Sequence, residues 1–229
     1  MSGRDGRAAM SGRDGRAAMS GRDGAVATRD RALRAQGRKT MRRLSDAGLR
    51  VFARRGYHQT RVDDIVRAAR TSHGTFYLYF SNKEDLLREL AVECAQALEG
   101  LAERVPAVPP TPEGAAALRA FLGEFLDTYA HYGVVIRAWM ENQVSDRKVD
   151  RLGVHAFTHI ARSLAVRMQE AGAVADETTV ASLMAMLERT SYAMTSRDLG
   201  LDRPAALDTL TTMIHRAFFT PSTPLPTKG

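Results

Sequence analysis

Five side chains that can bind a phosphate or the edge of a base lie within nine positions of one another: Thr71, Ser72, His73, Tyr77 and Tyr79. Hydroxyl and imidazole groups donate and accept hydrogen bonds, so they can contact phosphate oxygens as well as base edges. No acidic residue falls between Arg67 and Asn82, so no carboxylate there repels a polyanion. This chemistry indicates a surface that enters the groove of a nucleic acid.

A short helix must precede these groups, and the residues before them predict it. Its apolar residues recur at three- and four-residue spacing and share one buried face: Val62, Ile65, Val66 and Ala69. Thr60 is expected to cap this helix, and Asp63, three residues later, is an Asp variant of the capping box.

A second helix, over 73–79, is predicted after a turn at 70–72, and a hydroxyl side chain of that turn (Thr71 or Ser72) is expected to cap it. Phe76 and Phe80 are four apart and form its inner face. At its start, Gly74 would let the backbone approach a phosphate closely. The partial positive charge of the helix N-terminus favours the same contact.

Helices on either side complete a three-helix domain. The segment 28–55 reads as one helix with a basic start, weakened at Gly37 and ending at Gly56. A capping box, Ser81-x-x-Glu84, starts a further helix that runs from Asn82 to about residue 104.

The motif T-x-V-D-D-I-x-x-A-A-x-T-S-x-G-T-F-Y-x-Y-F-x-N-K-E-D-L-L, over residues 60–87, resembles the helix-turn-helix of the TetR family of bacterial transcriptional regulators. The resemblance extends from about Arg38 to Leu90. It implies an all-helical homodimer that binds a palindromic operator, usually as a repressor, and that a small molecule in the C-terminal domain releases. Carried over to this chain, with Arg61 added, the DNA-contacting residues are Arg61, Val62, Thr71, Ser72, His73, Gly74, Tyr77, Leu78, Tyr79 and Lys83.

Two positions depart from the family pattern. Leu78 can offer only an apolar contact, such as one to a thymine methyl group. His73 stands where the family often has Lys or Arg, and a histidine contact is expected to be weaker and sensitive to pH.

The charge of the chain is concentrated in its first part. Residues 1–90 hold 20 basic and 10 acidic side chains, against 13 and 16 in residues 91–229. This asymmetry favours a phosphate-binding N-terminal half. The first 24 residues repeat MSGRDGRAA and are expected to be disordered. Two interpretations stay open for them: a basic arm near DNA, or a passive tail.

The rest of the chain predicts helices near 114–131, 134–144, 147–171, 176–198 and 204–219, after a proline-rich loop at 106–112. The fold class is therefore all-α, with a helix-turn-helix DNA-binding domain and a larger helical domain for an effector and for dimerisation. The predicted boundaries are a tail at 1–27, a DNA-binding domain at 28–81, a second domain at 82–220 and a loose tail at 221–229.

The second domain offers candidates for two surfaces. Aromatic residues and pliable methionines could line an effector pocket, although residues of these types at helical spacing are more often ordinary core: Phe121, Phe125, Tyr129, Trp139, Met140, Phe157, Met168, Met184, Met186 and Tyr192. Two apolar stripes at helical spacing predict a four-helix dimer interface or, alternatively, the chain's own core: Val180, Leu183, Met184, Leu187, Ser191, Met194, Leu207, Leu210, Met213, Ile214, Ala217 and Phe218.

Enzyme and metal chemistry find little support. His155 and His159 have ligand spacing on a helix, but no Cys or Glu near them in sequence completes a motif. Nucleotide-binding and nucleophile motifs are absent from the sequence, so we expect no enzyme, no metal and no cofactor. A single cysteine, Cys94, excludes an intrachain disulfide and fits the cytoplasm. No apolar run is long enough to span a membrane.

Three hypotheses follow. The first is a dimeric repressor released by a small, largely apolar molecule. The second is a regulator of the same fold without a small effector, as an architectural protein or an activator. The third is a helical enzyme or carrier whose basic half binds something other than DNA.

Overall fold

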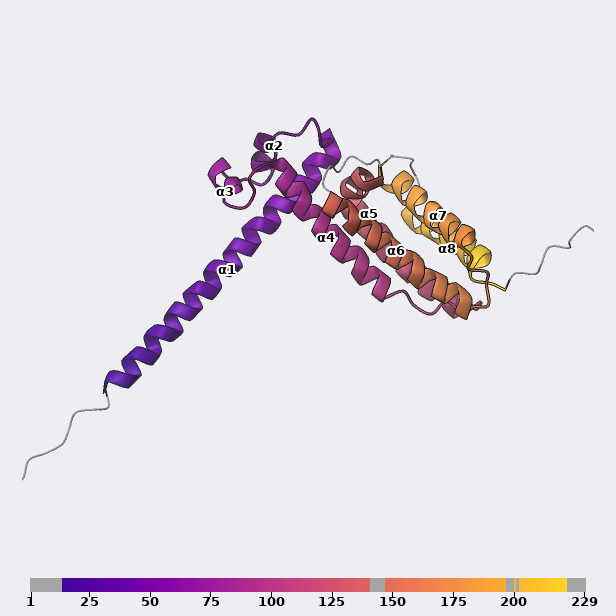
Figure 1. The fold of residues 1–229 in the computed structure, drawn as a ribbon, viewed down its shortest axis with the longest axis horizontal. Helices are drawn as coiled ribbons and strands as arrows, with labels where there is room; N and C mark the ends of the chain where they lie inside the picture. Colours follow the sequence, from indigo (N-terminus) through magenta and orange to yellow (C-terminus); the bar gives the residue numbers. More distant parts are fainter. Residues whose placement is uncertain (1–13, 141–146, 197–199, 201, 222–229) are drawn as a thin grey trace, which may run out of the picture. The chain divides into compact units, whose positions relative to one another are not determined.

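The computed structural model describes the backbone of residues 14–140, 147–196, 200 and 202–221, and side chains from residue 34 onward except those of Met140, Val149 and Ser196. Over these residues the regular secondary structure consists of eight α-helices, which confirms the all-α prediction (Figure 1). The chain divides into two units, 1–44 and 45–229, and each is described separately.

The first helix, α1 (Asp14–Arg55), is longer than the sequence suggested. It begins inside the predicted tail at 1–27, whose first 13 residues lie outside the described part, and it continues through Gly37. Alanines at 17, 18, 25 and 27 favour the helix, and a single glycine costs only about 1 kcal/mol. The predicted end is confirmed, because Gly56 has a φ of +80° and its N–H donates to the Phe52 carbonyl at 2.9 Å.

Helices α2 (Val62–Ala68) and α3 (His73–Tyr77) form the predicted pair, and α4 (Lys83–Glu103) follows. Phe76 and Phe80 are both buried, as their spacing predicted. Gly48 of α1 lies against α4 so closely that a Cβ on it would come within 2.7 Å of Leu86 Cδ2. The short helices are therefore held on a core to which α1 and α4 also contribute.

Two of the predicted helix caps are wrong by one residue. The N-cap of α2 is Arg61, whose N–H donates to Asp64 Oδ2 at 3.1 Å, whereas Thr60 turns back and donates its hydroxyl to the Gly56 carbonyl at 2.8 Å. The N-cap of α4 is Asn82, whose side chain accepts from the Asp85 N–H at 2.8 Å. In both places two neighbouring residues could form the cap, and local hydrogen bonds of the folded chain show which of them does.

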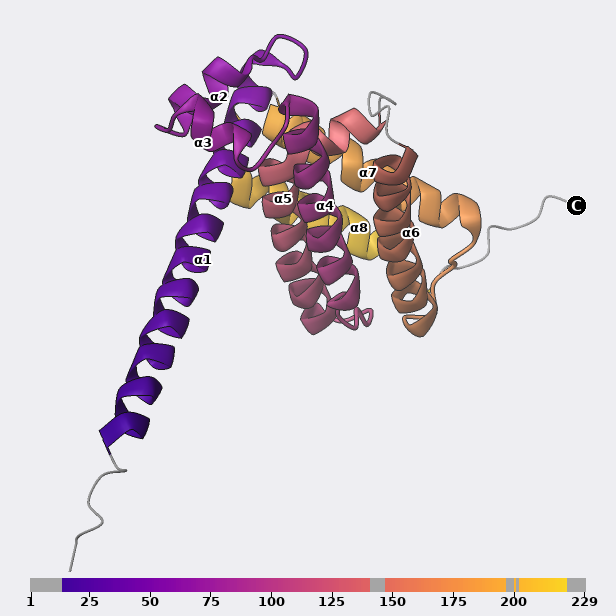
Figure 2. The same cartoon turned by 60° about the vertical axis from the view of Figure 1, so that its left-hand side comes forward.

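Four longer helices make the rest of the chain: α5 (Pro112–Met140), α6 (Arg147–Glu170), α7 (Glu177–Ser196) and α8 (Arg203–Phe218). The predicted break at Gly133 is wrong, because α5 runs through it and Gly133 lies buried beside Tyr129. Figure 2 shows α4 alongside α5 and α6, and α5 in turn packs against α7 and α8. Segments 141–146 and 222–229 fall outside the described residues, and the latter makes up all of the predicted tail but Pro221.

The proline-rich loop between α4 and α5 is held by side chains from the far end of the chain. His215 Nε2 donates to the Pro109 carbonyl at 2.9 Å, and Arg167 Nε donates to the Val105 carbonyl at 3.1 Å. Gly114 is required next to this loop, since a Cβ there would lie 2.0 Å from the Pro109 carbonyl oxygen. Among the described helices, none is long and apolar enough to cross a membrane.

Candidate nucleic-acid interface and effector cavity

The turn between α2 and α3 sets the direction of the predicted DNA-contacting residues. Arg70 adopts a left-handed conformation with a φ of +50°, and the Thr71 N–H donates to the Val66 carbonyl at 3.0 Å. Ser72 then caps α3, because its Oγ accepts from the Thr75 N–H at 3.1 Å. Of the two candidate caps, the structure therefore selects Ser72.

The residues of α3 divide into an inner and an outer face. Phe76 is fully buried, whereas Tyr77 is 57% exposed and Leu78 is 80% exposed. Ser72, His73 and Gly74 are also exposed, and Thr71 and Tyr79 are half-buried. The structure thus brings the predicted contact residues of α3 to the surface around one short helix.

His73 has a partner that the sequence did not suggest. Its Nε2 lies 2.5 Å from Asp63 Oδ1 of α2, and both side chains are more than half exposed. Asp63 was expected to take part in capping α2, but Asp64 fills that role. The pair joins α2 to the first residue of α3 and places a carboxylate among the predicted contact residues.

Lys83 is held by the protein itself. Its Nζ donates to the carbonyls of Tyr57 at 3.2 Å, His58 at 3.2 Å and Thr60 at 3.1 Å. It also lies 4.7 Å from the centre of the Tyr57 ring. Lys83 therefore fastens the loop before α2 to the start of α4, and its contact with DNA stays a prediction.

Tyr57, beneath Lys83, links the same loop to the core. Its ring packs edge-on against Phe52 at 5.3 Å between centroids. Burial, together with the nearby Glu84 carboxylate, raises the pKa of the Tyr57 hydroxyl to about 12. Tyr57 is thus a neutral anchor at physiological pH.

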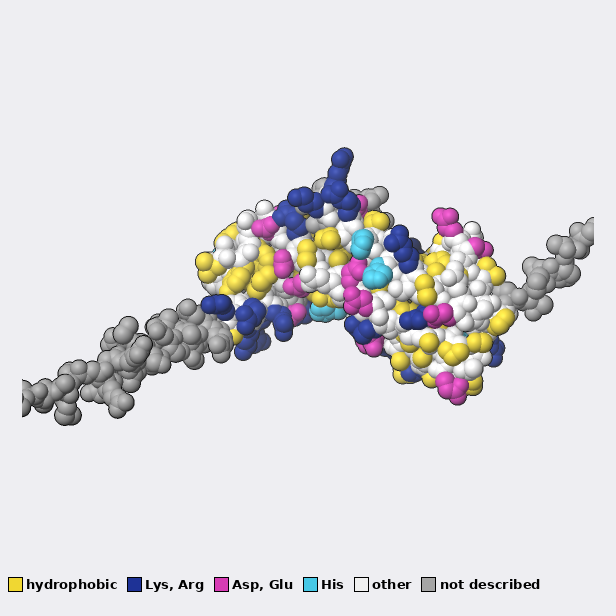
Figure 3. Space-filling model, turned by 60° about the horizontal axis from the view of Figure 1, so that its bottom comes forward, with side chains coloured by type: hydrophobic (Ala, Val, Ile, Leu, Met, Phe, Trp, Pro, Cys, Tyr) yellow, Lys and Arg dark blue, Asp and Glu magenta, His cyan; other side chains and the backbone are white. Residues whose placement is uncertain are grey.

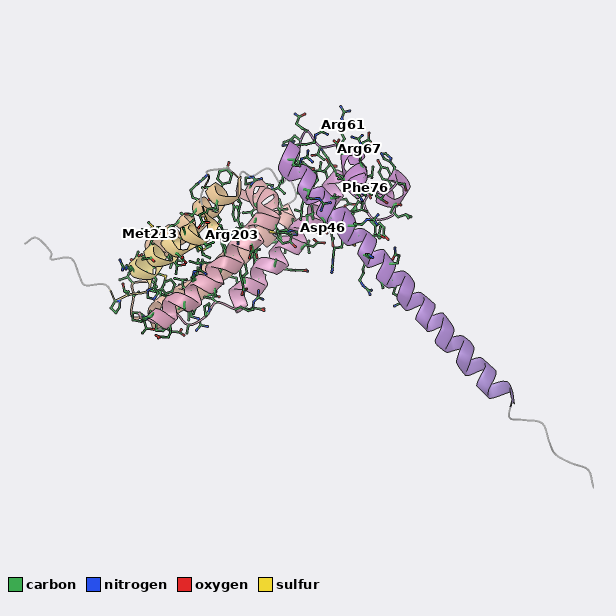
Figure 4. All side chains as sticks on the ribbon, turned by 180° about the vertical axis from the view of Figure 1, so that it is seen from behind. Asp46, Arg61, Arg67, Phe76, Arg203 and Met213 are labelled. Atoms are coloured by element: carbon green, nitrogen blue, oxygen red, sulfur yellow. The ribbon has the colours of Figure 1, made fainter. Side chains whose placement is uncertain are left out.

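A basic cleft between the end of α1 and α2 was missed by the sequence reasoning. It measures about 350 Å³ and is lined by Val51, Arg54, Arg55, Asp64, Arg67 and Ala68. The Arg61 N–H, and then the guanidinium groups of Arg55 and Arg67, lower the pKa of the Asp64 carboxyl. Figure 3 shows basic side chains gathered over the part that carries α2, and Figure 4 places Arg61 and Arg67 there. The charge asymmetry of the sequence was the one signal that pointed to this region.

A cavity of about 770 Å³ lies between α5, α6 and α7. Three of the predicted effector residues line it: Trp139, Phe157 and Met184. Its floor is formed where Gly153 of α6 meets the Trp139 ring, and a Cβ on Gly153 would lie 2.6 Å from Trp139 Cδ2. Most of the remaining lining is small or apolar: Val154, Thr158, Ala161, Ala181 and Ala185.

Other predicted effector residues lie elsewhere. Phe121, Phe125 and Met168 are buried core residues that do not line this cavity, because α5 and α6 turn them toward neighbouring helices. Met186 is half-buried on α7 and is also outside the lining. The side chain of Met140 lies outside the described part of the structure.

Charged groups stand at one edge of the cavity, where the lining includes Asp150, Glu188 and Arg189. The Tyr129 hydroxyl donates to Glu188 Oε1 at 3.0 Å, and burial raises the pKa of this tyrosine. Arg189 lies 5.2 Å from the centre of the Tyr192 ring. Tyr129 and Tyr192 therefore contact the lining residues Glu188 and Arg189 but do not line the cavity themselves.

Most of the stripe residues predicted for a dimer interface are buried within the chain. The exposed fractions are 0% for Leu183, 1% for Leu187, 8% for Leu207, 5% for Leu210, 1% for Ile214, and 8% for Phe218. Ser191 is fully buried, and Val180, Met184 and Met194 are half-buried. These residues therefore belong to the chain's own core, which was the alternative prediction. Of the two stripes, Met213 and Ala217 are exposed.

The histidine pair of α6 acquires the acidic neighbour that it lacked in sequence. Glu99 of α4 binds His155 Nδ1 through Oε1 at 2.8 Å and His159 Nδ1 through Oε2. These bonds, that from His159 first, lower the pKa of the Glu99 carboxyl. Over the described residues, no group of three or more side chains is arranged to hold a metal ion. The cluster is a polar tie between α4 and α6.

Comparison with known proteins agrees with the predicted resemblance. Residues 44–90 match the family model described as bacterial regulatory proteins, tetR family. The chain is also 41% identical over 71 residues to the fatty acid metabolism regulator protein of Bacillus subtilis (strain 168). That stretch covers 31% of this chain and 37% of the relative, so the chain matches well under half of that protein's length.

Solved structures share the fold of most of the chain. AibR, in complex with isovaleryl coenzyme A and operator DNA, has a TM-score of 0.59 at 17% identity, over 80% of this chain and 100% of AibR. FadR from Bacillus subtilis, in complex with stearoyl-CoA, has a TM-score of 0.54 at 19% identity, over 79% and 98% of the two chains. At these identities the likeness shows the fold alone.

Proposed function

We propose, from the match of residues 44–90 to the family model of the tetR bacterial regulatory proteins, that this chain is a dimeric transcriptional repressor that binds a palindromic operator and is released by a small, largely apolar molecule. The matched relatives are transcriptional regulators, which agrees with the prediction that the chain is not an enzyme.

The outer face of α3 supports DNA binding most directly. Tyr77 and Leu78 have large, mainly apolar side chains, and both are exposed to water. They lie at the end of α3, which has only five residues. Both residues lie within the segment that matches the family model, so they are candidates for contact with DNA. Beside them the N-terminus of α3, with Ser72 and Gly74, offers backbone N–H groups to a phosphate.

The small size of the α3 surface supports dimerisation. One short helix contacts too few base pairs for a specific site, whereas two copies related by a two-fold axis contact two half-sites. The buried stripes of α7 and α8 cannot supply the contact, so we assign it to their outward faces. Met213, which is 53% exposed, lies on this face of α8 (Figure 4).

The cavity supports an effector with an apolar body. Its volume of about 770 Å³ falls in the range of drug-sized ligand sites, and Trp139, Phe157 and Met184 give it apolar walls. AibR and FadR, which share the fold, were solved with acyl-CoA ligands. We therefore propose an acyl thioester, with its acyl group against Trp139 and its charged part toward Arg189.

The experiment that tests this function begins with selection of bound duplexes from a random pool by the purified protein. Enrichment of a palindrome is expected, and failure to enrich any sequence would refute DNA-binding regulation. Trp139 is the only tryptophan, so its emission reports on the cavity. An acyl-CoA that acts as effector should change that emission, raise the melting temperature and weaken operator binding together. A selected operator with no responding ligand would favour the same fold without a small effector.

A further inference from the structure

One exposed carboxylate that caps no helix lies among the residues that face DNA in the proposed function. Between Thr60 and Lys83 the sequence has two acidic residues, Asp63 and Asp64. Asp64 is occupied by the Arg61 N–H and by Arg55, and its side chain is only 13% exposed. Asp63 caps nothing in the structure, and its side chain is 62% exposed. An exposed carboxylate at this place repels phosphates, so its presence calls for a specific partner in the DNA.

His73 holds that carboxylate in one position. Because a carboxylate can only accept, the His73 Nε2 at 2.5 Å carries the hydrogen and donates it to Asp63 Oδ1. The bond runs from α2 to the first residue of α3, beside the exposed Ser72 and Gly74. It engages one oxygen of Asp63, and no other hydrogen bond to this side chain is found among the described residues. Oδ2 keeps its lone pairs for a donor outside the protein.

The major groove offers few groups that can satisfy an oxygen that only accepts. Phosphates, guanine N7 and O6, and thymine O4 are all acceptors, so they repel it. Cytosine N4 and adenine N6 are the amino donors. Beside the adenine amino group lies the acceptor N7, whereas the cytosine amino group has a C–H beside it. Cytosine is therefore the base that a carboxylate fits best.

We propose that Asp63, positioned by His73, is a specificity-determining residue that accepts a hydrogen bond from a cytosine amino group in each half-site of the operator. This inference rests on the proposed function, since it needs α3 to enter the major groove. It differs from the expectation that His73 contacts DNA as a weak substitute for Lys or Arg. Here the ring turns its distal nitrogen toward Asp63, and the carboxylate reads the base.

The fold does not depend on this pair, which makes substitution informative. Exposed pairs between ionisable side chains add little to stability, and both partners lie on the surface. Asp63→Asn keeps the shape and removes the charge, while its amide can donate as well as accept. His73→Gln removes the ring that positions Asp63. Glu103→Gln, at the exposed far end of α4, removes one negative charge without touching the surface of α2 and α3, and so is the matched control.

The test is duplex selection by the parent and the three variants, followed by titration of duplexes altered at one base pair. The parent should enrich a palindrome with cytosine at one fixed position of each half-site. Replacing that cytosine in one half-site should weaken parent binding about tenfold, and should weaken Asp63→Asn binding less than about threefold. His73→Gln should relax the same position in part, and Glu103→Gln should keep the parent's preference.

The outcomes separate the inference from the proposed function. If the parent enriches no sequence, DNA-binding regulation itself fails. If the parent enriches a palindrome and Asp63→Asn keeps every base preference of the parent, the role of Asp63 is refuted while the regulator stands. If Asp63→Asn relaxes the cytosine position but His73→Gln leaves it unchanged, the positioning role of His73 is refuted. Melting curves that match the parent's within a few degrees show that each variant is folded.

Discussion

Replacing Gly153 with alanine should close the floor of the effector cavity. The new Cβ would lie 2.6 Å from Trp139 Cδ2, 2.8 Å from Cε2 and 2.9 Å from Cγ, so it would press on the face of the ring. Ordinary contact begins near 3.4 Å, so either the ring or α6 must move by about 0.8 Å. Trp139 is 7% exposed and lines the cavity, so the space into which it can move is the cavity itself.

The free energy follows from two opposing terms. Overfilling a packed contact costs about 1–3 kcal/mol. Alanine in place of glycine within a helix regains about 0.5–1 kcal/mol. Gly153→Ala should therefore lower the free energy of unfolding by up to about 2.5 kcal/mol. The matched control is Gly123→Ala in α5, whose Cβ would meet Leu207 Cδ2 at an ordinary 3.8 Å and should leave the protein as stable or slightly more so.

Urea denaturation, followed by the emission of the single tryptophan, measures both effects. Gly153→Ala should unfold at lower urea than Gly123→Ala, and its native emission spectrum should shift. Binding of an acyl-CoA effector should weaken in Gly153→Ala alone. Equal midpoints for the two variants, with native spectra like the parent's, would show that Gly153 does not pack on Trp139 as described.

Three further predictions concern other parts of the chain. Lys83→Met should lose about 1.5–3 kcal/mol of stability, because three carbonyls lose a charged donor, and thermal melting with operator titration should show lower stability along with weaker binding. Leu78→Ala should leave stability within about 0.5 kcal/mol, since the side chain is 80% exposed, and gel shifts should show weaker operator binding. Glu99→Gln should be less stable than the parent above the unfolded-state pKa of about 4.3, and the difference should vanish as pH falls through the lowered folded-state pKa, as denaturation at several pH values would show.

Lys83 shows what a sequence motif can predict about a residue and what it cannot. The resemblance implied only that Lys83 contacts DNA. The structure gives Lys83 three carbonyl partners from residues that lie more than twenty positions earlier. Loss of stability is therefore expected together with any loss of DNA binding. Stability and operator affinity must both be measured to separate the two effects.

The apolar stripes show the same limit in the second domain. Helical spacing correctly placed Leu187 and Ile214 on inward faces, because the spacing follows from the pitch of the helix. It could not say whether the inward face meets the chain's own helices or another copy. Burial within one chain shows that most of these residues meet the chain's own helices, so the dimer contact that we propose uses the outward faces of α7 and α8.

The sequence by itself predicted the all-helical fold, because the spacing of apolar residues acts over a few residues, whereas the domain boundaries and the DNA-contacting residues stay predictions. Tertiary structure decided which aromatic residues line the cavity. It also brought Asp63 to His73 and Glu99 to the histidines of α6. These contacts join residues from different helices, and the spacing of residues along the chain carries no record of which helices will pack together.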